Sequence, residues 1–158
     1  MSMLDTKMTR FEVRGSRKEE RGFSHRDLIV WQKAMQLVSS VYRFSQSFPQ
    51  DERFGLTSQM RRAAVSVPSN IAEGRSRSSR KDFAQFLHTA LGSLAELETQ
   101  LEIAQNLNFG DAREYVACIT LVEEVRRMLL ALVAKLKGDF KPRTSNLEPR
   151  TFSRKHHA

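Results

Sequence analysis

Apolar residues recur along much of the chain at alternating spacings of three and four positions, which is the pattern of amphipathic helices. The clearest series comprises Phe83, Leu87, Ala90, Leu94, Leu97, Leu101 and Ala104. A later series comprises Cys118, Val122, Val125, Leu129, Leu132 and Leu136. The two series predict helices of about 26 residues each, and the short segment between them makes the helices antiparallel neighbours.

The first half of the chain holds two more helical patterns. Between residues 28 and 48 the apolar positions form two adjacent rows, one of Trp31, Met35, Val38 and Tyr42 and one of Ala34, Leu37, Val41, Phe44 and Phe48. A second helix follows the row Leu56, Met60, Ala63 and Val67 and continues to Asn70 or Ile71, before Gly74. Pro68 lacks the amide that would bond to the carbonyl of Ala64, so we expect a kink or a restart there.

No strand pattern competes with these four helices. Their seven-residue apolar spacing predicts an all-α fold, an antiparallel up-and-down four-helix bundle over residues 23–138 with its second helix kinked near Pro68. Capping signals agree with these bounds, namely Ser24 with Asp27, Ser79 with Asp82, Asp111 with Glu114, and the helix-ending Gly110 and Gly138.

The two ends of the chain differ from this pattern. Residues 1–22 and 139–158 are polar and charged without periodicity, and we expect both to be disordered basic tails. The longest apolar run, residues 128–134, is far shorter than the ~20 residues that a membrane span needs, and the N-terminal residues hold no apolar secretion signal. With Cys118 as the single cysteine, no intrachain disulfide can form. The chain is therefore expected to be a cytoplasmic protein without membrane contact.

Helix four carries more apolar surface than one seam of a bundle uses. Leu121, Met128, Leu130 and Val133 lie beside its main row. Either the face buried inside the monomer is broad, or these side chains form a contact between subunits.

The charge of the chain suggests a polyanionic partner. Its formal net charge is +8 and its isoelectric point is near 10.1. Six cations are expected near one end of the bundle, with Ser76, Ser78 and Ser79 interleaved, and they are Arg61, Arg62, Arg75, Arg77, Arg80 and Lys81. Together with the free amides of a helix N-terminus they form a candidate phosphate-binding surface. The alternative is an ordinary solvated surface balanced by acidic neighbours.

This basic cluster contains no interleaved aromatic residue in the sequence, which favours contacts to the nucleic-acid backbone over stacking of bases.

Signals for an enzyme are scarce. The four histidines have no spacing suited to a shared metal, and phosphate-loop and dinucleotide-binding motifs do not occur. Helix three carries Glu96, Glu98 and Glu102, and helix four carries Glu123 and Glu124, without the Glu-x-x-His pairs of a di-metal bundle. We interpret these glutamates as solvated or as partners in salt bridges between subunits, and we expect no catalytic residue, metal or cofactor.

The segment from Gln59 to Gly74 resembles the signature of a bacterial four-helix bundle family. That family includes proteins encoded in intervening sequences of large-subunit ribosomal RNA genes and the accessory variability determinant of diversity-generating retroelements. Residues 31–34, 48–49, 55–57, 92–94 and 96–100 are similar as well, so that the resemblance spans about residues 26–137. It implies an up-and-down bundle that assembles as a homopentamer and, in the retroelement case, associates with a reverse transcriptase and nucleic acid.

The signature also has a physical interpretation. Its marked residues are Ser66, Pro68, Asn70, Glu73 and Gly74. Asn70 falls on the core row of its helix, where its side chain can satisfy the carbonyl of Ala64 that Pro68 leaves without a donor, or can cap a neighbouring turn. A structural role for Ser66, Asn70 and Glu73 is therefore the first hypothesis, and ligand binding is the second.

Two functions remain open at this point. In the first, a homo-oligomer binds structured RNA or DNA through the six cations, with little base specificity. In the second, the spare apolar surface or a bundle end docks a protein partner, and the chain does not bind nucleic acid directly.

Overall fold

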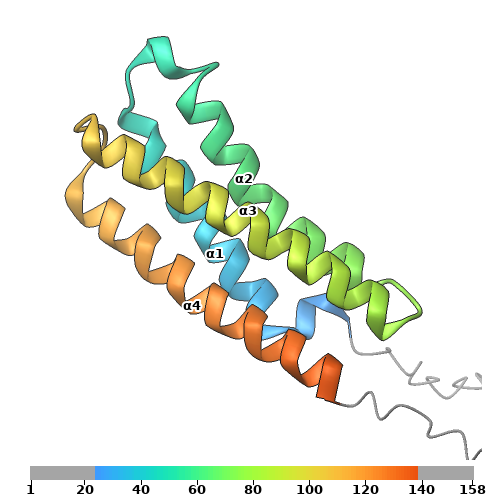
Figure 1. Ribbon diagram of the computed structural model, residues 1–158. Coiled ribbons are helices and arrows are strands. Elements are labelled where there is room, and N and C mark those ends of the chain that lie inside the picture. Colours follow the sequence, from blue (N-terminus) through green and yellow to red (C-terminus); the bar gives the residue numbers. More distant parts are fainter. Residues whose placement is uncertain (1–23, 139–158) are drawn as a thin grey trace, which may run out of the picture.

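The computed structural model describes residues 24–138, and the predicted tails at 1–22 and 139–158 lie outside the described residues. Four long helices make up this part of the chain: α1 (Ile29–Phe44), α2 (Leu56–Arg75), α3 (Arg80–Asn106) and α4 (Ala112–Gly138). Short 3₁₀ turns at His25–Asp27, Ser45–Ser47 and Gln50–Glu52 precede α1 and connect it to α2. Figure 1 shows the helices side by side along one axis. Within residues 24–138 the chain forms no strand, and the predicted all-α fold is confirmed.

The helices pack as an antiparallel bundle in which α1 contacts α2 and α4, and α3 contacts the same two helices. The core consists of the apolar rows predicted from the sequence. Leu37, Met60, Leu94 and Leu129, one from each helix, are fully buried. Because each helix contributes one such row, the four rows close around a single core.

The helix starts follow the predicted caps. Ser24 and Asp27 form a complete capping box, although it caps the 3₁₀ turn before α1 rather than α1 itself. The hydroxyl of Ser79 accepts a bond from the amide of Asp82 at 3.0 Å, at the start of α3. Asp111 accepts bonds from the amides of Arg113 and Glu114 at 2.8 and 3.3 Å and so caps α4.

Helix α2 is continuous through Pro68, so the chain does not restart there, and it ends at Arg75 rather than at Ile71. Pro68 itself is buried. Gly74, which we expected to follow the helix, lies inside it. A Cβ at this position would lie 2.6 Å from the Cβ of Phe86 and 2.9 Å from a ring carbon of Phe83. The glycine is needed because α3 passes this close, and α2 and α3 are the most closely packed pair in the bundle.

The additional apolar residues of α4 do not share one environment, because some are buried inside the monomer and others are exposed on its surface. Val133 is buried in the core, Leu121 and Met128 are half-buried, and Leu130 is 51% exposed. On α1, Met35 and Tyr42 are exposed, whereas Trp31 and Val38 of the same row are half-buried. Apolar side chains therefore remain uncovered on both helices of the single chain. None of the helices in the described part of the chain combines the length and apolar character of a membrane span.

The close approach of α2 and α3 predicts opposite effects for two glycine substitutions. Gly74→Ala should lower the free energy of unfolding by about 1–3 kcal/mol, because the new methyl group overlaps Phe83 and Phe86. Gly92→Ala should raise it by about 0.5–1 kcal/mol, because Gly92 lies in an open position inside α3. Urea denaturation followed by circular dichroism measures both, and equal effects of the two substitutions would contradict the packing described here.

Candidate nucleic-acid interface

Four of the six predicted cations lie together at one end of the bundle. Arg75 is the last residue of α2, Arg77 lies in the turn that follows, and Arg80 and Lys81 are the first residues of α3. The same end receives Lys135 and Lys137 from the last turn of α4. A surface hollow of about 450 Å³ joins Arg75, Arg77 and Arg80 to Lys135, and a hollow of about 530 Å³ joins Arg80 and Lys81 to Lys137. We call these six residues the basic end.

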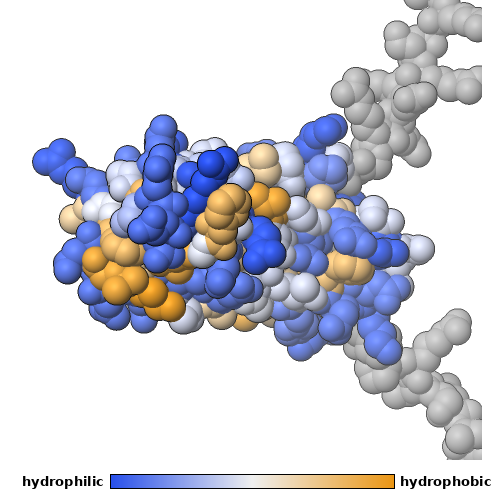
Figure 2. All heavy atoms as spheres, turned by 90° about the horizontal axis from the view of Figure 1, so that it is seen from above, coloured by the Kyte–Doolittle hydropathy of each residue, from blue (hydrophilic) through white to orange (hydrophobic). Residues whose placement is uncertain are grey.

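The two lysines were missed in the sequence because nothing near them in the chain marks a site. The up-and-down topology could have revealed them, because four antiparallel helices bring the end of α4 beside the turn between α2 and α3. In Figure 2 hydrophilic surface predominates near the points where the grey traces leave, and the larger apolar patches lie toward the middle and the other end.

Arg61 and Arg62 do not belong to the basic end, contrary to the prediction. Both lie in the second turn of α2, near the opposite end of the bundle. The 14 positions that separate Arg61 from Arg75 correspond to about 20 Å along a helix that rises 1.5 Å per residue. The six predicted cations therefore form two separate groups.

Helix dipoles contribute little to the potential of the basic end. The N-termini of α1 and α3 and the C-termini of α2 and α4 meet there, so partial positive and partial negative charges oppose one another. The charged side chains consequently decide the sign of the field.

Neighbouring groups fix the position of Arg77. Its guanidinium pairs with Glu73 at 2.5 Å and lies 4.8 Å from the centre of the Phe86 ring. Glu73 therefore orients a cation of the basic end, and the carbonyl of the same residue accepts a bond from the hydroxyl of Ser76 at 2.6 Å. The serines of the turn are likewise engaged with the backbone, since Ser79 caps α3.

In the second group of arginines, Arg61 lies beside an aromatic ring that comes from α1. Arg61 is 4.5 Å from the centre of the Tyr42 ring, and its Nε donates to the hydroxyl of Ser45 at 2.9 Å. Arg53 lies 5.5 Å from the centre of the Phe54 ring. No aromatic residue is interleaved with the cations in the sequence, but folding brings the Tyr42 ring to Arg61 and the Phe86 ring to Arg77.

The polar residues of the signature join α2 to α3. The Nδ2 group of Asn70 donates to the carbonyl of Ser66 at 2.8 Å and to the hydroxyl of Ser66 at 3.0 Å. The hydroxyl of Ser66 lies 2.8 Å from that of Ser93, which donates to the carbonyl of Thr89 at 3.2 Å. Counting one proton per hydroxyl, the bonds run in one direction from Asn70 through Ser66 and Ser93 to Thr89.

This arrangement corrects one detail of the prediction. Asn70 is half-buried and bonds to Ser66, not to the carbonyl of Ala64 beside Pro68. Asn70 therefore acts within α2, and the bond that crosses to α3 is made by Ser66 with Ser93. A structural role for Ser66, Asn70 and Gly74 agrees with these contacts.

Two of the five predicted glutamates of α3 and α4 form ion pairs within the chain. Glu98 pairs with Arg126, and Glu124 pairs with Lys33 of α1 at 3.0 Å. These contacts connect α4 to α3 and to α1, so the two glutamates need no partner from another subunit. Among residues 24–138, no three His, Cys, Asp or Glu side chains are grouped so that they could hold a metal ion.

Cys118 is a buried residue of the contact between α1 and α4. Burial raises the pKa of its thiol, and a hydrogen bond with the hydroxyl of Ser40, whose oxygen is 3.3 Å from Sγ, offsets part of that rise. The raised pKa favours the neutral thiol, which is the unreactive form.

Comparison with known proteins agrees with a helical bundle of this kind. A crystal structure of a protein of unknown function from the S23 ribosomal protein family of Bacteroides thetaiotaomicron superposes with a TM-score of 0.62. The two chains are 22% identical, and the match covers 66% of this chain and 98% of that one. This likeness concerns the fold. No curated protein matches the chain.

The family itself is shown by the sequence match. Residues 26–131 match the family described as 23S rRNA-intervening sequence protein, and the chain belongs to that family. The match includes α1, α2 and α3 and most of α4.

The polar contact between α2 and α3 can be tested by a pair of serine substitutions. Ser66→Ala should lower the free energy of unfolding by about 1 kcal/mol, because it removes the interhelical bond to Ser93 and one acceptor of Asn70. Ser69→Ala should change it by less than about 0.5 kcal/mol, because the hydroxyl of Ser69 is exposed and donates only to the carbonyl of Val65 in its own helix. Thermal denaturation of both variants measures the difference, and equal stabilities would refute the proposed role of Ser66.

Proposed function

We propose that the chain is a non-enzymatic, homo-oligomeric protein that binds the phosphate backbone of nucleic acid through its basic end. The observation that supports this function is the convergence of Arg75, Arg77, Arg80 and Lys81 with Lys135 and Lys137 from three segments of the fold. Cations collected on one surface attract a polyanion and contact phosphates without reading bases. Arg61 and Arg62 remain candidates for nucleic-acid contact at a separate place.

The family name suggests which nucleic acid to test first. Because the family is named for the intervening sequence of 23S ribosomal RNA, structured RNA is the first candidate and DNA the second. The resemblance to retroelement accessory proteins adds a reverse transcriptase as a candidate partner. Both settings are compatible with a partner that is a polymer of phosphates.

An oligomer would multiply the basic end. The exposed apolar side chains of α1 and α4, among them Met35, Val116 and Leu130, support a contact between copies, because burying them removes apolar surface from water. The resemblance implies five copies. A symmetric ring would then repeat the six cations around its axis and enlarge the surface that faces the nucleic acid.

A protein-interaction scaffold is the second candidate function. The same exposed apolar side chains favour it, because they would suit a different protein as well as another copy. Copurification of a protein partner that survives nuclease treatment would favour the scaffold over direct nucleic-acid binding.

Salt dependence tests the mechanism of binding. Between about 50 and 300 mM salt, the affinity for a hairpin RNA or a duplex DNA should fall about fivefold for every phosphate contacted, because each contact releases counterions. Fluorescence anisotropy over a salt series gives the slope. An affinity that stays constant over this range would refute backbone binding.

One lysine and one arginine substitution, each of which removes a single positive charge, test whether the basic end binds the nucleic acid. Lys81→Ala should weaken binding and lower the slope of log affinity against log salt by about 0.9. Arg127→Ala, on an exposed position midway along α4, is the matched control and should leave the slope unchanged. Equal effects of the two substitutions would indicate that net charge, rather than the basic end, determines binding.

The mass in solution tests the assembly. Light scattering should give a multiple of the 18.2 kDa chain, and five copies is the expected number. Leu130→Glu should reduce this mass if α4 lies in the contact, because a charge would replace a half-exposed leucine in an apolar interface. A monomer at micromolar concentration would contradict the oligomer.

A further inference from the structure

A hollow of about 610 Å³ lies where the end of α1 meets the start of α2, away from the basic end. Its lining combines aromatic, cationic and hydroxyl side chains and includes no carboxylate among the described residues. The lining residues are Tyr42, Arg53, Phe54, Thr57, Ser58, Arg61, Arg62, Val65 and Ser66. A surface of this composition suits a ligand that is both planar and anionic.

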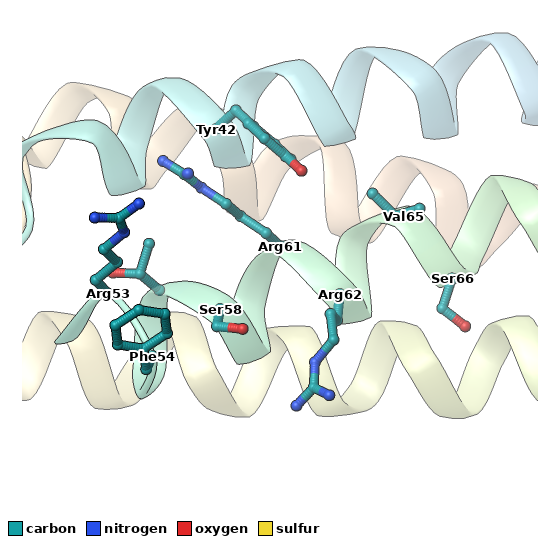
Figure 3. A pocket seen from close by; sticks show the side chains of 9 residues that line it. Tyr42, Arg53, Phe54, Ser58, Arg61, Arg62, Val65 and Ser66 are labelled. Atoms are coloured by element: carbon teal, nitrogen blue, oxygen red, sulfur yellow. The ribbon is translucent and has the colours of Figure 1, made fainter.

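Contacts within the protein hold part of this surface in place before any ligand binds. Arg61 lies against the Tyr42 ring and donates to Ser45, so its guanidinium is fixed from two sides. Figure 3 shows Arg61 extending toward Tyr42, while Arg62 points to the other side of α2. Arg53 and Phe54 lie at the entrance to α2. Cations therefore flank the hollow on two sides.

Phe54 is 88% exposed, which makes it the most exposed large apolar side chain of the described residues. An exposed phenylalanine ring is in contact with water, which is unfavourable. A flat partner that covers the ring removes it from water and so lowers the free energy. One side of the ring lies near Arg53, and the side chain reaches outward from the bundle.

Thr57 adds an independent sign of a ligand. It lines the hollow with only 7% of its surface exposed, and its hydroxyl oxygen has no hydrogen-bond partner in the described part of the chain. A buried hydroxyl without a partner is costly, and because this oxygen is covered, a polar ligand atom would reach it only with a small shift of the lining side chains.

We propose that this hollow binds one unpaired nucleotide of the nucleic acid that the basic end holds. The base stacks on Phe54, and Arg53 and Arg61 on one side and Arg62 on the other contact the phosphates that flank it. Stacking on an aromatic ring accepts any base, so the site selects unpaired structure rather than sequence. A peptide carboxylate would satisfy the arginines but not the exposed ring, whereas a nucleotide satisfies both.

The distance to the basic end agrees with a single bound strand. The ~20 Å between Arg61 and Arg75 along α2 corresponds to about six base-pair steps at the ~3.4 Å rise of a DNA duplex. An RNA hairpin can therefore place its stem on the basic end and an unpaired residue in the hollow. This inference rests on the proposed function, since the strand is first attracted by the basic end.

The test compares a hairpin RNA that has an unpaired loop with a fully paired duplex of the same length, using the full chain. Wild-type protein should bind the hairpin more tightly. Phe54→Ala should weaken hairpin binding about five- to 150-fold, the range that corresponds to stacking of one base, and should leave duplex binding unchanged. Phe54→Trp should restore the preference, because it keeps a stacking surface.

Controls separate this inference from the proposed function. Ile103→Ala removes another exposed apolar side chain, on α3, and should affect neither ligand. Unchanged hairpin binding in Phe54→Ala, with Lys81→Ala still weakening both ligands, would overturn the hollow and keep the basic end. Phe54→Ala could instead change the oligomer mass in light scattering and keep the preference for the hairpin. This result would show that the hollow lies in a contact between copies, and it would overturn the inference. Wild-type protein that binds neither ligand would overturn both proposals.

Discussion

The close approach of α2 to α3 is the packing constraint on which the other features depend. Gly74 lets the side chains of Phe83 and Phe86 reach the backbone of α2, and the bond between Ser66 and Ser93 joins the same two helices farther along. With the helices this close, the turn between them is short, and the cations on both sides of it become neighbours. A larger residue at position 74 would push apart the two helices that form most of the basic end.

The fold was predictable from the sequence because the apolar rows are long and uninterrupted. Local chemistry also located the caps at Ser79 and Asp111, since a capping residue acts on amides only two or three positions away. The end of α2 was not predictable in this way. A glycine at this point of the sequence is typical of a helix end. Glycine is required at position 74, however, because α3 passes close by, and the local sequence does not reveal that contact. The hydrogen-bond partner of Asn70 was also predicted wrongly. Asn70 donates to Ser66, whose hydroxyl bonds in turn to Ser93 in another helix.

The candidate site was predictable only where its residues are close in sequence. Arg75, Arg77, Arg80 and Lys81 lie within seven positions and meet at one turn. To predict that Lys135 and Lys137 belong to the site, the topology of the bundle had to be known. To predict that Arg61 and Arg62 lie apart from it, the length of α2 had to be known. The aromatic neighbour of Arg61 could be found only from the packing itself, since Tyr42 comes from α1.

Because the bundle has an even number of helices, the two ends of the described chain lie at the same end of the bundle, beside the basic end and away from the hollow near Phe54. Residue 24 and Gly138 both lie at the end that holds the turn between α2 and α3, so any segment joined to either terminus is covalently attached beside the cations. The hollow near Phe54 is formed entirely by internal segments. The attachment points of both chain ends therefore lie beside one surface and not beside the other. Under the proposed function, the surface that attracts a polymer and the surface that discriminates its shape are therefore built from different parts of the chain.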